Sequence, residues 1–263
     1  TATPIPRTLA MAAYADLDTS IIDELPLGRK PIKTLIISNN KRKSVIEKIK
    51  FACQNGQQAY WVCPLIEISD KLDLAAAEER FQHLNSIFTD RVALIHGRMK
   101  DIEKDRIMDS FRAGKVDILV ATSVIEVGVD VPDATIMVIE HAERFGLAQL
   151  HQLRGRVGRG LEQSTCLLLY SAPLSENARA RINVLRESED GFIIAEEDLK
   201  LRGAGEVLGI KQSGLPHFKI ADLTFHSDLL ELARNEAKLI LNKDPDLISN
   251  RGEALKILLY LFE

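Results

Sequence analysis

Short apolar segments alternate with helix-forming segments over residues 32–190, and this alternation constrains the fold more than any other feature of the chain. Several of the apolar segments are near-continuous runs of Val, Ile, Leu and Cys, as is typical of strands covered on both faces. Strands separated by helices form βαβ units, which build a parallel sheet. The pattern therefore predicts an α/β fold in which helices flank a mostly parallel sheet.

Six strands and the helices between them are predicted from this pattern. The strands are residues 34–38, 59–64, 91–96, 117–121, 134–140 and 164–170, and the helices are residues 41–54, 74–88, 102–112, 146–155 and 175–187. Right-handed crossovers place the carboxyl ends of parallel strands along one edge, where ligands bind in such folds. We therefore expect the functional loops at that edge.

The segments on either side of this pattern have a different character. Residues 1–31 are broken by four prolines, so we expect a leading segment with few regular elements. From residue 191 a charged stretch, a glycine-rich stretch and two amphipathic helices over 227–242 and 252–262 follow one another. We predict an α/β domain over 32–190 and a helical extension over 191–263. Because the chain begins at Thr1 without Met, we expect it to be a piece of a longer protein.

The composition is that of an ordinary soluble globular protein, with 46% hydrophobic and 27% charged residues. A formal net charge of −4 argues against a surface coated in positive charge, although a local basic groove stays possible. Cys53, Cys63 and Cys166 are far apart and adjoin apolar runs, which indicates buried reduced thiols and no metal site. No apolar run approaches the ~20 residues that a membrane span needs, so we expect a cytoplasmic protein.

Residues 152–159 read QLRGRVGR and carry the strongest candidate site. If the segment is helical, Gln152, Arg156 and Arg159 are spaced i, i+4 and i+7 and share one face. Guanidinium groups keep their charge and bind oxygens in pairs, so this face suits the phosphates of a nucleotide triphosphate. A set of arginine fingers is one interpretation, and a solvated basic helix or a nucleic-acid patch is the other. The spacing alone leaves both open.

Residues 117–132, DILVATSVIEVGVDVP, place polar groups directly after a predicted strand. Hydroxyls of Thr122 and Ser123, with the amides of a following helix start, can hold a phosphate. Gly128 permits a tight backbone, and Asp130 offers a carboxylate to a ribose hydroxyl. An ordinary helix N-cap pair followed by a turn Asp explains the segment equally well.

The segment HGRM follows the predicted strand 91–96. Arg98 in this segment is a candidate contact for a backbone phosphate, because it follows a strand in the same row of loops. A single histidine in such a place is more often a hydrogen-bonded structural residue, so we expect that role for His96.

Taken in order, these motifs resemble the second motor lobe of superfamily 2 helicases. The segments are TATPIPRTL, VCPLI, HGRM, ATSVIEVGVDVP and QLRGRVGR. The leading run TATPIPRTLAMAAYADLDTSIIDELPLGR and the later run DGFIIAEEDLKLRGAGEVLGIKQSG resemble the RecG-type DNA helicases in particular. The resemblance covers essentially the whole chain. It implies a RecA-like lobe of an ATP-dependent helicase that remodels replication forks and Holliday junctions in DNA repair and recombination.

The resemblance also implies roles for residues that match the family's motifs. Thr1 and Thr3 fall on the segment that couples the nucleotide state to DNA contact. Arg156 and Arg159 match the arginine fingers that act on the γ-phosphate, and Gln152 lies beside them.

Two further motifs of the family bear on DNA and on the nucleotide. Thr122 and its neighbour Ser123 match a contact with the DNA backbone, and Asp130, after Gly128, matches an acidic residue that reaches the ribose. The later run matches a translocation motif, a helical hairpin shared with the transcription-repair coupling factor. Its arginine, which links motor movement to DNA pulling, falls on Arg202, and its surroundings include Glu197 and Gln212. Ala204 departs from the motif, because many relatives carry Pro there.

No GxxxxGK[ST] motif is present, so nothing in the chain is expected to cradle the β-phosphate. The resemblance implies that ATP and Mg²⁺ are held mainly by a first motor lobe on the N-terminal side of Thr1, where the family also has a wedge domain. The expected partners are branched or forked DNA and those two domains, with no membrane and no metal site. A coupling-type translocase, a non-catalytic scaffold lobe and an RNA helicase stay open as alternatives.

Overall fold

The computed structural model describes residues 30–64, 70–122, 131–160, 162–202 and 227–262. The chain divides into two compact units, with a boundary between Ile194 and Ala195. The first unit contains the sheet and the helices around it, and the second contains the last two helices. Among the described residues, no helix is long and apolar enough to cross a membrane.

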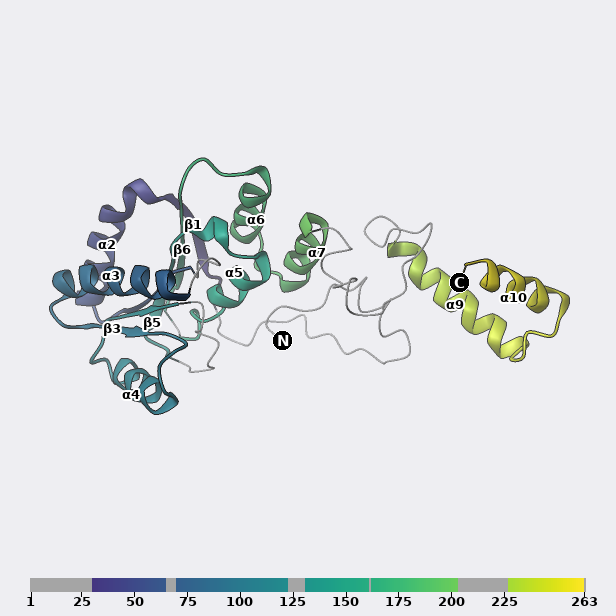
Figure 1. Ribbon diagram of the computed structural model, residues 1–263, viewed down its shortest axis with the longest axis horizontal. Coiled ribbons are helices and arrows are strands. Elements are labelled where there is room, and N and C mark those ends of the chain that lie inside the picture. The colour runs from purple at the N-terminus through teal and green to yellow at the C-terminus, as the bar shows by residue number, and fades with distance from the viewer. Residues whose placement is uncertain (1–29, 65–69, 123–130, 161, 203–226, 263) are drawn as a thin grey trace. The chain divides into compact units, whose positions relative to one another are not determined.

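Six strands form a single sheet in the first unit, and every neighbouring pair is parallel (Figure 1). The spatial order is β1-β6-β5-β2-β4-β3. The α/β fold with a parallel sheet is therefore confirmed. The strands are β1 Lys33–Ser38, β2 Gln58–Val62, β3 Val92–Ile95, β4 Ile118–Ala121, β5 Ala134–Ile139 and β6 Thr165–Tyr170, close to the predicted bounds.

Helices connect the strands in the predicted places. The first unit has α2 Arg42–Gln54, α3 Asp70–Phe88, α4 Asp101–Arg112, α5 Leu147–Arg154 and α6 Glu176–Glu187, with short 3₁₀ turns η1 Asn39–Lys41 and η2 Ala142–Arg144. α7 Gly191–Arg202 is an additional helix that the sequence pattern does not predict. The second unit has α9 Ser227–Lys243 and α10 Asn250–Phe262, which match the two amphipathic helices expected there.

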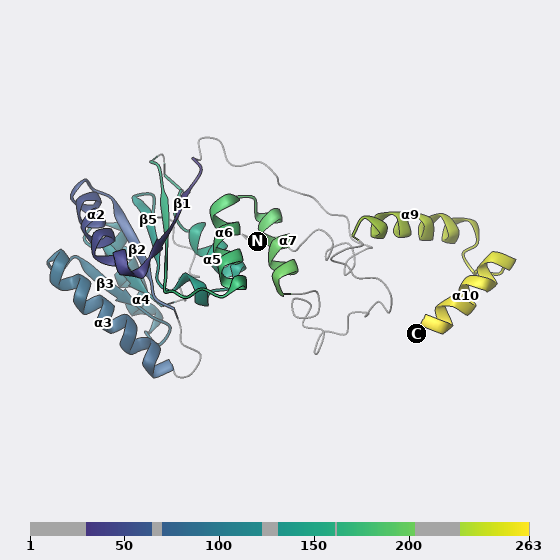
Figure 2. The same ribbon diagram turned by 90° about the horizontal axis from the view of Figure 1, so that it is seen from above.

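The sheet is apolar on both faces, because alternate residues of each strand point to opposite sides. Ala59 and Trp61 of β2 belong to a buried cluster with residues of α2 and α3, including Ile49 and Leu84. Tyr60 lies between them in sequence and packs on Phe111 of α4, with 5.1 Å between ring centroids. Figure 2 shows α2 and α3 on one side of the sheet and α5 and α6 on the other. Such double coverage explains the unbroken apolar strands.

The three cysteines are free thiols. Cys63 and Cys166 are buried as predicted, whereas Cys53 is only half-buried. Burial raises the pKa of each of these thiols to about 12, so all three are protonated and unreactive at neutral pH.

Candidate functional site

Because all strands run in one direction, the sheet has a carboxyl edge, where the strands end, and an amino edge, where they begin. His96, Thr122 and Glu140 directly follow β3, β4 and β5 and mark the carboxyl edge. Ile32 and Pro132 precede β1 and β5 and mark the amino edge. The predicted site residues divide between these two edges, whereas we expected the functional loops together at the carboxyl edge.

Arg98 and Thr122 lie at the carboxyl edge on neighbouring strands. β3 and β4 pair with Ile95 opposite Ala121, and the Thr122 amide donates to the Ile95 carbonyl at 3.3 Å. Arg98 is exposed, while Thr122 is only 3% exposed. The structure therefore brings the two predicted DNA-contacting segments together, and of the two side chains Arg98 is the one at the surface.

The segment QLRGRVGR is not one continuous helix. α5 ends at Arg154, and Gly158 has a φ of +79°, which no helical residue adopts. The helix predicted over 146–155 is confirmed, but it ends before the two arginines, so the condition under which Gln152, Arg156 and Arg159 would share one helical face is not met. Only Gln152 lies on α5, and both arginines belong to the turn over residues 155–160, which we call the arginine turn. Two glycines within the segment end the helix, because glycine is a poor helix former.

Two glycines hold the arginine turn against the amino edge of the sheet. A Cβ atom on Gly158 would lie 2.9 Å from Cγ1 of Ile32, and one on Gly160 would lie 2.7 Å from the carbonyl oxygen of Pro132. Real Cβ atoms do not approach other atoms so closely, so a larger residue would force the Ile32 side chain or the turn to shift at Gly158, and the backbone to shift at Gly160. The turn thus lies beside the beginnings of β1 and β5.

The arginines around this turn occupy different environments. Arg159 is exposed, Arg156 is half-buried, and Arg154 is only 2% exposed. The NH1 group of Arg154 donates to the carbonyl oxygens of Leu185 at 2.6 Å and Ser188 at 2.8 Å, at the end of α6. Burial lowers the pKa of Arg154, although the group stays charged at neutral pH.

Arg154 was missed because arginine is normally read as a surface residue. The signal that finds it is its spacing from Leu147 and Leu150 on α5, since these two leucines are buried and lie seven and four residues before it. Arg154 therefore continues the buried face of the helix.

The remaining predicted site residues lie on α7 or outside the described residues. Pro132, which approaches Gly160, directly follows the sequence segment that contains Gly128 and Asp130. Glu197 and Arg202 lie on α7, where Glu197 forms a 2.7 Å ion pair with Lys200. Outside the described residues lie Thr1, Thr3, Ser123, Gly128, Asp130 and Gln212.

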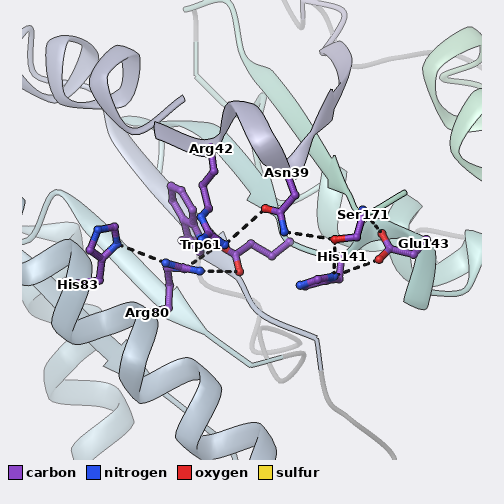
Figure 3. A network of polar contacts seen from close by, with 9 residues as sticks. Asn39, Arg42, Trp61, Arg80, His83, His141, Glu143 and Ser171 are labelled. Atoms are coloured by element: carbon purple, nitrogen blue, oxygen red, sulfur yellow. Dashed lines mark hydrogen bonds and ion pairs between the residues drawn. The ribbon is translucent and has the colours of Figure 1, made fainter. Parts of the chain in front are cut away.

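A polar network at the carboxyl edge was not predicted (Figure 3). Glu140, directly after β5, is 5% exposed and accepts a hydrogen bond from the Trp61 indole at 3.0 Å. It also pairs with Arg80 of α3 at 2.6 Å and lies 3.9 Å from Arg42 of α2. The signal in the sequence is a charged residue directly after an unbroken apolar strand.

The network continues through His141, which has a left-handed backbone with a φ of 50°. Its Nδ1 atom lies 3.0 Å from Oε1 of Glu143 and 3.4 Å from Oγ of Ser171, and Asn39 donates to that same hydroxyl at 3.3 Å. Burial alone would raise the pKa of Glu143, but the hydrogen bonds to His141 and the Ser171 amide outweigh it and lower that pKa. The network thereby ties together the ends of β1, β5 and β6.

No group of three or more His, Cys, Asp or Glu side chains that could hold a metal ion occurs among the described residues. His96 has a buried Nδ1 atom that lacks a hydrogen-bond partner in the structure, so the hydrogen-bonded role expected for it is not seen at that atom. Arg98 at the carboxyl edge and Arg159 at the amino edge are exposed, and guanidinium groups suit phosphate oxygens.

Two family models match different parts of this chain. Residues 40–160 match the family model described as the helicase conserved C-terminal domain. Residues 188–259 match the model described as ATP-dependent DNA helicase RecG, domain 3, C-terminal. The second match includes α7, α9 and most of α10.

Individual relatives agree with these matches. The ATP-dependent DNA helicase RecG of Escherichia coli O127:H6 (strain E2348/69 / EPEC) is 58% identical over 85% of this chain and 32% of its own length. That of Pasteurella multocida (strain Pm70) is 53% identical over 94% of this chain and 36% of its own length. The chain therefore spans about a third of the length of these curated relatives.

A solved structure of RecG bound to a three-way DNA junction is similar to this chain, with a TM-score of 0.69 and 47% identity. The similarity covers 87% of this chain and 30% of that one. It includes the parallel sheet and its flanking helices, so the fold is RecA-like.

Proposed function

We propose, because this chain forms the C-terminal region of a RecG-type helicase of superfamily 2, that it serves as the second motor lobe of an ATP-dependent helicase acting on branched DNA. The relatives are named ATP-dependent DNA helicases, and the similar solved structure holds a three-way DNA junction. The observation that carries the proposal is the arginine turn, which two close glycine contacts hold at the amino edge of the lobe.

At the amino edge, Arg156 and Arg159 act on the γ-phosphate of ATP as arginine fingers, with Gln152 beside them. Guanidinium groups neutralise the charge that develops during phosphoryl transfer, and a finger contributes about 10³–10⁵ in rate. The glycine contacts fix the turn before the reaction, so little reorganisation is needed. Asp130 and Gly128 serve the ribose, which is consistent with the approach of Pro132 to the turn.

ATP and Mg²⁺ are held mainly by a first motor lobe in this proposal. When bound, Mg²⁺ neutralises charge on the phosphate oxygens. Arg156 and Arg159 fit the task of stabilising the γ-phosphate, because Arg159 is exposed and a guanidinium group is a permanent cation.

At the carboxyl edge, Arg98 contacts the DNA backbone, together with Thr122 and Ser123. Contacts to phosphates carry no sequence information, which suits a motor that must move along any sequence. Thr1 and Thr3 link the nucleotide state to this contact. The translocation motif, with Glu197, Arg202 and Gln212, converts lobe movement into pulling on the duplex.

In this proposal, the amino edge senses the nucleotide and the carboxyl edge holds the DNA. Fingers from this lobe reach a nucleotide held by the other lobe, so closure of the two lobes depends on ATP. Hydrolysis removes the γ-phosphate contact and releases the closure. The proposed DNA contacts lie at the opposite edge of the same lobe. Opening and closing of the lobes therefore moves these contacts relative to the DNA in each cycle.

The domain arrangement proposed for the chain is a leading segment over residues 1–31, a RecA-like lobe over 32–190 and a translocation-motif region over 191–263. The partners are branched or forked DNA and the protein's own first lobe and wedge domain, and the place of action is the cytoplasm. The match of residues 188–259 to the RecG model supports a RecG-type helicase over the coupling-type translocase.

The test compares two substitutions in a protein that joins this chain to a first motor lobe. We expect Arg159→Ala to lose DNA-stimulated ATP hydrolysis by about 10³-fold or more. Arg202→Ala is expected to keep much of the hydrolysis but to lose fork unwinding. Arg112→Ala is the matched control, because Arg112 is a surface arginine paired with Asp109 and should change neither activity. Equal loss of hydrolysis in the first two variants would overturn the assignment of separate roles.

A further inference from the structure

Arg154 carries a charge where a folded protein rarely buries one. Its side chain lies at the last residue of α5, and its NH1 group bridges the carbonyl oxygens of Leu185 and Ser188 at 2.6 and 2.8 Å. These carbonyls belong to the C-terminal end of α6, where four carbonyl groups have no partner within the helix and carry partial negative charge. The guanidinium therefore caps α6 from the end of a different helix.

Stability alone is a weak reason for this arrangement. Removing a guanidinium from water is costly, and an apolar side chain of similar volume in the same place often gives an equally stable or more stable fold. What the arginine adds is a defined position, because the guanidinium is planar and the two N–H bonds of its NH1 group point in fixed directions toward the two carbonyl oxygens. The end of α5 is thereby fixed relative to the end of α6.

The arginine turn begins directly after this fixed point. Further along, Gly158 lies against Ile32 and Gly160 lies against Pro132. The turn is thus held at three places, and Arg156 lies between the first two. The Arg156 amide also donates to the Leu153 carbonyl at 3.1 Å, so the backbone of Arg156 follows the end of α5. A release at Arg154 removes the attachment of that end to α6.

We infer that Arg154 is a positioning residue for the arginine turn, and that it acts on phosphoryl transfer through Arg156 and Arg159. This inference rests on the proposed function of those two residues. A displacement of about 1 Å in a group that stabilises a transition state can cost about 10²-fold in rate, so the position of the turn is a sensitive quantity.

The experiment uses a protein that joins this chain to a first motor lobe, with Arg154→Met and Arg154→Lys compared. For Arg154→Met we expect kcat of DNA-stimulated ATP hydrolysis to fall about 10²-fold, with KM for ATP changed less than about 3-fold. Arg154→Lys keeps a charge but not the planar fork, so its kcat should lie between those of Arg154→Met and the unsubstituted protein.

Arg91→Met is the matched control. Arg91 also donates a hydrogen bond to a carbonyl oxygen, that of Gly114, at 2.8 Å, and it forms an ion pair with Asp117 at 2.6 Å. It precedes β3, at the opposite end of the sheet from β1, and so lies away from the arginine turn. We expect this variant to lower Tm while kcat of the folded enzyme stays unchanged. If Arg154→Met or Arg154→Lys behaves in the same way, the positioning role is overturned.

A combined substitution separates positioning from a general loss of structure. If Arg154 acts through Arg156 and Arg159, adding Arg154→Met to a variant that carries both Arg156→Ala and Arg159→Ala should lower kcat by less than about 3-fold more. If the fold-losses in kcat of the separate substitutions multiply in full when they are combined, the inference is overturned. If Arg159→Ala alone leaves kcat unchanged, the proposed function itself fails, and this outcome is distinct from a failure of the positioning role.

Discussion

Glu140 shows how one side chain at the end of a strand can organise its surroundings. It follows β5 directly and accepts the Trp61 indole N–H from β2 at 3.0 Å. Arg80 of α3 pairs with it at 2.6 Å, and its side chain is only 7% exposed. A carboxylate buried in this way is tolerated because each donor satisfies part of its charge. It joins the sheet to a helix at the carboxyl edge.

We expect Glu140→Ala to lower the free energy of unfolding by about 3–5 kcal/mol, because Arg80 is then left largely buried without its partner. Urea unfolding of the chain measures this change. Asp109→Ala is the matched control, since its ion pair with Arg112 is exposed and should contribute less than about 1 kcal/mol. Equal changes in the two variants would contradict the role given to burial.

His151 on α5 makes the stability of the chain depend on pH. Burial, and then the charge of Arg154, lower the pKa of His151 to about 4, while the charge of Asp190 acts in the opposite direction. In the unfolded chain His151 has an ordinary pKa of about 6.5. Between about pH 4 and pH 6.5 it therefore binds a proton in the unfolded chain but not in the folded chain. The contribution of His151 to the free energy of unfolding is therefore fully present above pH 6.5 and is lost as the pH falls from about 6.5 to about 4.

Between pH 7.5 and 5.5 we expect this histidine to remove about 1 kcal/mol from the free energy of unfolding, with allowance for partial exposure of its ring. His151→Gln should remove that part of the dependence. Urea unfolding of both proteins at the two pH values isolates it, because the other titrating groups are shared. The same pH dependence in both would show that the folded chain accepts the proton as readily as the unfolded one.

Among single residues, burial was the property that the sequence predicted least well. Arg154 and Arg156 both occur in QLRGRVGR, and nothing in their immediate neighbours distinguishes them. Arg154 is 2% exposed and donates hydrogen bonds to two carbonyl oxygens at the end of α6, while Arg156 is half-buried in a turn. The difference depends on where α5 ends and on a helix that lies about thirty residues further along the chain, so it is a tertiary effect.

At the scale of elements, the strands were predictable because both faces of the sheet are covered, which leaves unbroken apolar runs in the sequence. α7 was missed because the charged run 196–200 hides the buried positions Ile194, Ala195 and Leu199. The arginine turn was missed because helical spacing was extended across Gly155 and Gly158. Each glycine weakens a helix by about 1 kcal/mol, which is enough to end it where packing favours a turn.

The arginine turn depends on glycine at residue 158. Ala at this position must adopt a φ of +79° and places a Cβ atom 2.9 Å from Ile32, so Gly158→Ala should lower the free energy of unfolding by about 2–4 kcal/mol. Gly114→Ala is the matched control, with a φ of +68° but open space around its Cβ, and should cost about 1–2 kcal/mol. Urea unfolding compares the two. Equal costs would mean that the turn yields to the added methyl group.

At the scale of the whole molecule, the predicted site residues lie at two edges of the sheet instead of one. A parallel sheet with right-handed crossovers favours the carboxyl edge as a ligand site, and Arg98 and Thr122 lie there as expected. The arginine turn precedes β6 and so returns to the amino edge, beside Ile32 and Pro132. Strand order was needed to see this, because the order β1-β6-β5 brings the starts of three strands together.

The proposed function places half of a nucleotide site on this chain, and that division has a measurable consequence. The sequence contains arginines suited to the γ-phosphate but no GxxxxGK[ST] motif to cradle the β-phosphate. We therefore expect the chain by itself to hydrolyse ATP no faster than a buffer blank, with or without forked DNA.

A coupled ATPase assay tests this expectation, with the same chain joined to a first motor lobe as the positive control. The joined protein should hydrolyse ATP in a DNA-dependent way, and Arg159→Ala within it should return the rate to near that of the separate chain, because the finger is then missing from an otherwise complete site. DNA-stimulated turnover by the separate chain that survives Arg159→Ala would mean that a different set of residues carries the reaction, and the division of the site between two lobes would then be wrong.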